Sequence, residues 1–144
     1  MGCEILQSIP KNSYQTREII TRFSVKDWAN QTLRSYGPFS SSSNASVTVG
    51  LSGFTPNVSW TFNLYSSSVK DDSSLSEKYA RWIFKLPLGT STAKNTFVMK
   101  PGARITNAVG QVGFKSTHNI DYYKNLNSQK VYNTGSLTRY LNDR

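Results

Sequence analysis

Few residues of this chain are able to act as nucleophiles, acid–base groups or metal ligands. Its 144 residues include one histidine, His118, and one cysteine, Cys3, and a dyad of the two requires the N-terminus to fold back onto a distant segment. Asp121 follows His118 by three residues, but no Gly-x-Ser-x-Gly motif supplies the serine of a Ser-His-Asp triad. We therefore interpret His118 as a polar residue in a turn between two strands and expect no enzymatic activity.

Metal sites have equally little support in the sequence. Zinc sites use several cysteine or histidine ligands, and the chain has one of each. Asp71, Asp72 and Glu77, with the serines between them, offer the oxygen ligands that calcium prefers, but they lack the alternating spacing of an EF-hand loop. We expect a solvated polar loop over residues 66–76 and no metal or other cofactor.

The strongest chemical signal is an excess of positive charge. Lysine and arginine number 17 against 8 aspartates and glutamates, a net charge of +9 at pH 7. A subset of the cationic residues alternates with apolar ones on predicted strands, which places that subset on the sheet face opposite the core. These residues are Arg81, Lys85, Lys100, Arg104 and Lys115. With Tyr122 and Tyr123, whose rings are suited to stacking, they form the binding surface that we predict for an anionic partner.

Charge alone does not identify this partner. An envelope polymer, an anionic lipid surface and a nucleic acid are all expected to bind such a surface in a salt-dependent way. Nucleic acid additionally requires exposed aromatic side chains interleaved with the basic ones. The oligomeric state is not determined by the sequence.

The first residues suggest attachment to a surface. Met1-Gly2-Cys3 has neither the basic nor the apolar region of a signal peptide, but a glycine directly before a cysteine is how a bacterial lipoprotein signal ends. We predict Cys3 as a site of lipid attachment in a secreted or cell-surface protein. Myristoylation of Gly2 with palmitoylation of Cys3 is the competing interpretation, although Leu6 stands where that motif has serine or threonine. The low cysteine content is typical of exported Gram-positive proteins, whereas a native start at Met1 favours a cytoplasmic protein.

Alternating polar and apolar residues indicate that strands position the basic side chains. The predicted strands lie at residues 17–25, 47–51, 58–64, 80–86, 95–100, 103–107, 111–115 and 120–123. Glycines and prolines separate many of them, and the tail after residue 124 holds either one more strand or a turn of helix. We predict an all-β fold, either an antiparallel β-sandwich or a small closed barrel of about eight short strands.

One short helix is expected near residues 25–36. Ser24 and Asp27 are spaced like a capping box, and Gly37-Pro38 is typical of a helix end. Apolar residues recur between them at helical spacing, namely Val25, Trp28, Ala29, Leu33 and Tyr36. Residues 1–15 lack periodicity and contain Pro10, so we expect an N-terminal arm or tether there and a single β-domain over 16–144.

Three functions are compatible with these observations. The first is an exported or surface-anchored, non-enzymatic binding domain whose basic sheet face engages an anionic envelope polymer, membrane or other polyanion. The second is an intracellular nucleic-acid-binding or particle-forming β-protein, which the same charge supports. The third is a small-ligand carrier barrel with aromatic residues such as Phe54 and Tyr65 at its rim.

Overall fold

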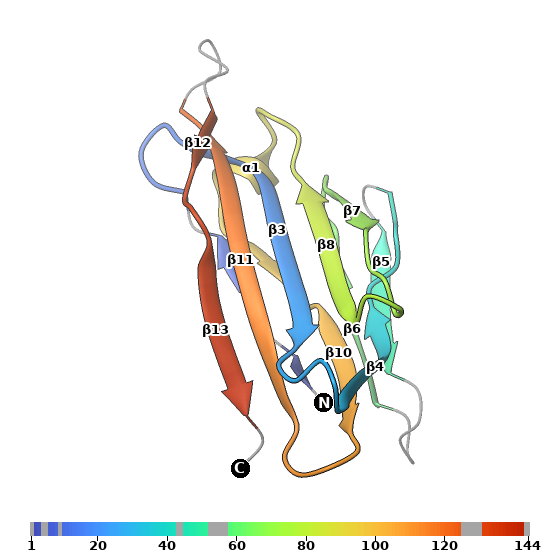
Figure 1. Cartoon of the computed structure of the whole chain (residues 1–144). Coiled ribbons are helices and arrows are strands. Elements are labelled where there is room, and N and C mark those ends of the chain that lie inside the picture. Colours follow the sequence, from blue (N-terminus) through green and yellow to red (C-terminus); the bar gives the residue numbers. More distant parts are fainter. Residues whose placement is uncertain are drawn as a thin grey trace.

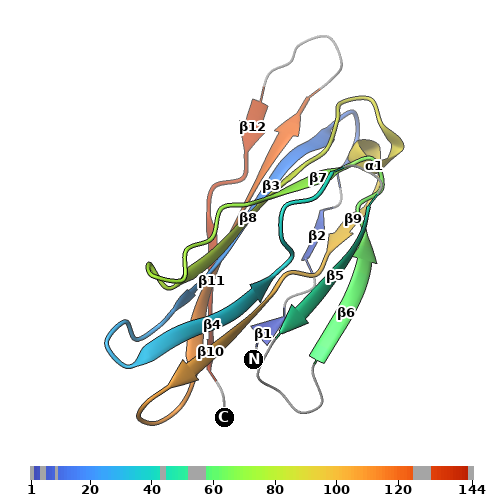
Figure 2. The same cartoon turned by 90° about the vertical axis from the view of Figure 1, so that its right-hand side faces the viewer.

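Two layers of antiparallel strands make up the fold (Figure 1, Figure 2). The computed structural model describes residues 2–3, 6–8, 10–42, 45–51, 58–124 and 131–142, with side chains from residue 10 to residue 141 of these ranges. The predicted all-β sandwich class is confirmed, and the strands in the described ranges do not close into a barrel. The helical content of these ranges is one short helix, α1 (Ser91–Lys94).

The first layer is a six-stranded sheet in the order β12-β11-β3-β8-β7, with β13 pairing with β11. Its strands are β3 (Gln15–Val25), β7 (Ser68–Asp71), β8 (Tyr79–Lys85), β11 (Gly113–Tyr123), β12 (Val131–Asn133) and β13 (Leu137–Asn142). The long strand β11 pairs with β3 on one side and with both β12 and β13 on the other. This sheet carries one broad outer face.

The second layer consists of three smaller sheets, β1-β10-β4, β2-β9 and β5-β6. Its strands are β1 (Gly2–Cys3), β2 (Leu6–Ser8), β4 (Gln31–Gly37), β5 (Ser46–Leu51), β6 (Val58–Asn63), β9 (Phe97–Met99) and β10 (Gly102–Asn107). The segment expected as an arm thus contributes two short strands, which pair with β10 and β9. Strands β9 and β6 are both edge strands of their two-stranded sheets.

Aromatic residues join the two layers in the core. Trp82 of β8 is fully buried, with its ring centroid 5.3 Å from that of Phe23 in its own sheet and 6.4 Å from that of Tyr36 on β4. Phe84 of β8 likewise lies 6.2 Å from Phe97 of β9. Full burial of each such ring contributes about 1.5–3 kcal/mol. The alternation that buries these residues turns the intervening residues of β8 outward.

The helix expected near residues 25–36 is not formed. Strand β3 ends at Val25, residues 26–30 make a turn between the two layers, and β4 follows. The Asp27 carboxylate accepts hydrogen bonds from the backbone N–H groups of Ala29 and Asn30 at 3.1 and 3.3 Å. Such side-chain to backbone bonds stabilise a turn in place of a continuing helix. The helical spacing of the apolar residues was therefore misleading, and Trp28 is exposed.

Two further expectations are corrected. Residues 113–123 form one continuous strand with His118 inside it, rather than two strands joined by a turn. The loop expected over 66–76 contains the edge strand β7, whose single buried residue, Val69, gave too short a pattern to predict. The tail contains strands, β12 and β13, in the described ranges.

Candidate functional site

Cationic side chains gather on the outer face of the six-stranded sheet. The outer basic face consists of Arg22, Lys70, Arg81, Lys85 and Lys115, all at outward-facing positions of β3, β7, β8 and β11. Three of the predicted binding residues, Arg81, Lys85 and Lys115, are thus brought together. Arg22 was missed, although the same alternation with Thr21 and Phe23 is visible in the sequence.

The centre of this face holds two like charges in direct opposition. Arg22 of β3 is the cross-strand partner of Arg81 of β8, an arrangement that ordinarily destabilises a sheet. The Arg81 guanidinium forms an ion pair with Asp72 at 2.8 Å, while the Arg22 guanidinium carbon lies 4.2 Å from the centroid of the Tyr79 ring. Asp72 therefore offsets one charge, and Arg22 stays exposed and cationic on its aromatic neighbour.

Exposed aromatic residues lie near the end of the first sheet at which β3 finishes. The Trp28 side chain is 55% exposed on the turn after β3, and the Lys78 ammonium lies 5.0 Å from its ring centroid. Tyr140 of β13 is 60% exposed and is the cross-strand partner of Lys115. Three cation–aromatic neighbour pairs therefore border one surface, namely Arg22 with Tyr79, Lys78 with Trp28, and Lys115 with Tyr140. The sequence analysis did not identify Trp28 as a surface residue because its spacing with other apolar residues predicted a helix.

The remaining predicted cations lie on the other layer. Lys100 follows β9, and Arg104 is on β10, where its cross-strand partner is Ser35 of β4. Strands β9 and β10 pair with β1, β2 and β4 and have no partner in the first sheet. The expectation that all five predicted cations share one surface is therefore corrected, because alternation fixes the face of a strand but not the sheet to which the strand belongs.

The opposite end of the first sheet combines basic residues with the carboxylate of Glu18. Lys85, Arg17, Glu18 and Tyr123 line a surface pocket of about 300 Å³ there. The Arg17 guanidinium lies 5.4 Å from the Tyr123 ring centroid, and Glu18 is the cross-strand partner of Lys85. Of the two predicted tyrosines, Tyr123 thus lies beside a basic residue of the face, whereas Tyr122 is paired with Tyr132 of β12.

The acid–base candidates His118 and Asp121 are both on β11. His118 points inward and is 8% exposed, and its Nδ1 lies 2.5 Å from the Thr21 hydroxyl oxygen. Asp121 follows His118 by three residues on the same strand. Because successive side chains of a strand point to alternate faces, Asp121 lies on the opposite face of β11. The pairing of these two residues that a catalytic triad requires is therefore not made.

The carboxylates considered for calcium, Asp71, Asp72 and Glu77, lie at the end of β7 and on the segment that follows it. Asp72 is paired with Arg81, and Asp71 is the last residue of β7. Within the described residues, no three histidine, cysteine, aspartate or glutamate side chains lie close enough together to hold a metal ion.

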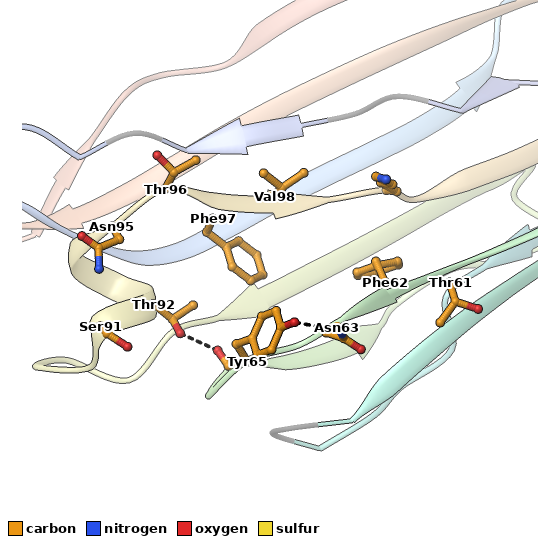
Figure 3. Close-up of a pocket in the computed structure, with 11 residues that line it drawn as sticks. Thr61, Phe62, Asn63, Tyr65, Ser91, Thr92, Asn95, Thr96, Phe97 and Val98 are labelled. Atoms are coloured by element: carbon orange, nitrogen blue, oxygen red, sulfur yellow. Dashed lines mark hydrogen bonds between the residues drawn. The ribbon is translucent and has the colours of Figure 1, made fainter.

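A groove opens between the edge strands β6 and β9 on the second layer (Figure 3). It has a volume of about 540 Å³. The residues that line it are Thr61, Phe62, Asn63, Tyr65, Ser91, Thr92, Asn95, Thr96, Phe97, Val98 and Lys100. Phe62 and Phe97 are buried, whereas the Tyr65 ring is 65% exposed. Tyr65, which we considered for the rim of a carrier barrel, thus lies at a groove between open sheets.

Hydrogen bonds close both ends of this groove. The Thr92 hydroxyl donates to the Tyr65 carbonyl at 2.6 Å, which ties α1 to the segment after β6. At the other end, the Trp60 indole N–H donates to the Lys100 carbonyl at 2.8 Å. The Asn63 amide donates to the Tyr65 hydroxyl at 2.9 Å and holds the exposed ring in place.

Some predicted features fall outside the description. Met1 and Phe54 lie outside the described residues, and Cys3 is described only by its backbone, which pairs with Gly102. In the described part of the chain, no helix has the length and apolar character needed to cross a bilayer.

Comparison with protein-family models and with curated proteins finds no match for this chain.

Proposed function

We propose that this chain is a non-enzymatic binding domain whose outer basic face holds an extended polyanion. The observation that carries the proposal is the opposition of Arg22 and Arg81 at the centre of the face. Like charges placed directly opposite each other are unfavourable in a sheet. Asp72 offsets the charge of Arg81 in the free protein, and an anion bound at the exposed Arg22 would offset the other charge. Lys115, diagonal to Arg22 across β3 and β11, extends the positive surface.

Single-stranded nucleic acid is the polyanion that this surface fits best. Phosphates need cations, and unpaired bases need exposed aromatic rings between those cations. Tyr79, Trp28 and Tyr140 supply such rings beside Arg22, Lys78 and Lys115. A broad sheet face with interleaved aromatic and basic side chains suits an unpaired strand better than the deep groove of a duplex.

An anionic envelope polymer or membrane surface is the second candidate. The observation that favours it is that cations also occur on the second layer, where the exposed Arg34 and the half-buried Arg104 lie near each other on β4 and β10. Charge distributed over both faces suits a partner that is read by charge alone. Under this candidate the protein is exported and Cys3 carries the lipid anchor.

Removal of charge from one face tests the proposal. The triple variant Arg22→Gln, Lys85→Gln, Lys115→Gln is compared with a control, Arg34→Gln, Lys94→Gln, Arg104→Gln, which loses the same charge elsewhere. We expect the first variant to bind a single-stranded oligonucleotide or an anionic vesicle roughly 100-fold more weakly, since each cation contributes about 1 kcal/mol. The control should lose much less affinity for the oligonucleotide, whereas equal losses of vesicle affinity in both variants would favour the second candidate, which uses the charge of both layers.

Two results of these measurements would contradict the proposal. Equal losses of oligonucleotide affinity in both variants would mean that net charge alone determines binding and that the outer basic face is no site. A wild-type protein that binds neither ligand at low salt would reject polyanion binding altogether.

A further inference from the structure

The groove between β6 and β9 has the shape of a site for a compact ligand. Both strands are edge strands, and an edge strand is the kind of element to which an extended peptide adds by backbone pairing. The hydrogen bonds from Thr92 to Tyr65 and from Trp60 to Lys100 close the groove at its two ends, however. Only about three residues of each strand lie between these closures, roughly 10 Å of strand. A passing peptide strand is therefore excluded, and a small molecule is favoured.

The lining of the groove matches the surface of a sugar. A sugar ring has a face of C–H groups and an edge of hydroxyls. The Tyr65 ring, 65% exposed, offers a flat apolar surface on which the C–H face of a sugar can stack. Amide and hydroxyl side chains around the groove can both donate and accept hydrogen bonds, as the sugar hydroxyls require. These side chains are Thr61, Asn63, Ser91, Thr92, Asn95 and Thr96.

The charge of the lining selects among sugars. Among the described residues that line the groove, Lys100 is the one that carries a charge, and none is a carboxylate. A negatively charged group on the ligand complements it. Glycosidic hydrolysis requires two facing carboxylates, so this lining binds a glycoside without cleaving it.

The aromatic ring is held ready for a ligand. The Asn63 amide donates to the Tyr65 hydroxyl, and the Thr92 hydroxyl donates to the Tyr65 carbonyl, so that ring and backbone are both fixed (Figure 3). Fixing an exposed side chain before binding reduces the entropy lost when the ligand arrives.

The structure assigns this groove to a short saccharide that carries a carboxylate, bound by stacking on Tyr65 and by an ion pair with Lys100. The site lies on the second layer, whereas the outer basic face belongs to the first. The assignment therefore does not depend on the proposed function.

Nuclear magnetic resonance titration of the full chain tests it. The probes are matched neutral and carboxylated sugars, such as galactose with galacturonic acid and galabiose with digalacturonate. We expect carboxylated sugars to shift the backbone amide signals of Tyr65 and Asn95, with millimolar or tighter affinity. Tyr65→Ala should weaken this binding roughly tenfold, and Tyr65→Phe should preserve most of it. Lys100→Gln should remove the preference for the carboxylated member of each pair.

A matched control separates this site from the outer basic face. Lys85→Gln removes one cation from that face and should leave the sugar titration unchanged, whereas Tyr65→Ala should leave oligonucleotide binding unchanged. Absence of groove shifts with every carboxylated sugar would overturn the assignment. So would shifts confined to β3, β8 and β11, or an equal response in Tyr65→Ala.

Discussion

Arg22 is the side chain on which the outer basic face depends most. It is exposed, it opposes Arg81, and its guanidinium lies over the Tyr79 ring. A cation on an aromatic face keeps its outer N–H groups available to a phosphate while the ring limits its motion.

Replacement of Tyr79 distinguishes the candidate ligands at this residue. Tyr79→Leu keeps the charge of the face but removes the ring, and stacking of a base contributes about 1–3 kcal/mol. We expect oligonucleotide affinity to fall at least about fivefold and binding to anionic vesicles to change less than about twofold. Fluorescence anisotropy and vesicle sedimentation measure the two. Equal losses would argue against base stacking at Tyr79.

The ionisation of Tyr36 makes the free energy of unfolding depend on pH in the alkaline range. Burial, the nearby Asp71 carboxylate and a hydrogen bond to it raise the pKa of Tyr36 above its ordinary value. Below about pH 9 the tyrosine is protonated in both the folded and the unfolded state. As the pH rises through about 10, the unfolded state loses the proton first, so the free energy of unfolding decreases.

Urea unfolding at increasing pH checks this sign. Tyr36→Phe cannot ionise, so we expect its stability to decline less steeply than that of the wild type between about pH 9 and pH 11. Tyr140→Phe, at an exposed position of β13, is the control and should follow the wild type. A Tyr36→Phe curve parallel to the wild-type curve would contradict the assigned cause.

At the scale of the element, β4 and β5 approach each other closely at one glycine. A Cβ atom at Gly37 would lie 2.8 Å from Cγ1 of Val49, which is fully buried. Glycine at the end of β4 therefore permits the contact between these two strands.

Gly37→Ala should destabilise the fold by about 1–3 kcal/mol, because the added methyl displaces a packed side chain. Gly50→Ala is a close control, since a Cβ there meets no atom within 4 Å, and it should change stability by less than about 0.5 kcal/mol. Chemical denaturation measures both. A Gly37→Ala protein as stable as the wild type would show that the strands separate without cost.

The elements with strict alternation were predictable from the sequence, and those held by other contacts were not. Strands β5 and β8 bury every second residue, and β6 alternates exposed residues with half-buried or buried ones, which is the pattern that predicted them. The turn after Val25 depends on hydrogen bonds to Asp27, and β7 has only Val69 to bury. Neither leaves a periodic signal.

At the scale of the whole molecule, alternation gave the face of each cation but not its layer. Lys115 and Arg81 share a surface because β3 lies between β11 and β8. Arg104 lies on the other layer because β10 pairs with β1 and β4. Sheet order arises from long-range pairing, which neither local spacing nor composition specifies. The groove at Tyr65 was likewise beyond prediction, because it needs β6 and β9 to end two separate sheets.

The salt dependence of oligonucleotide binding tests the central claim most directly. If Arg22, Lys85 and Lys115 each contact a phosphate, the logarithm of the association constant should fall with the logarithm of salt concentration with a slope of about −2. Fluorescence anisotropy with a labelled single-stranded oligonucleotide gives this slope, and the triple variant Arg22→Gln, Lys85→Gln, Lys115→Gln should make it much shallower. No complex even at low salt, or a complex insensitive to salt, would contradict the account.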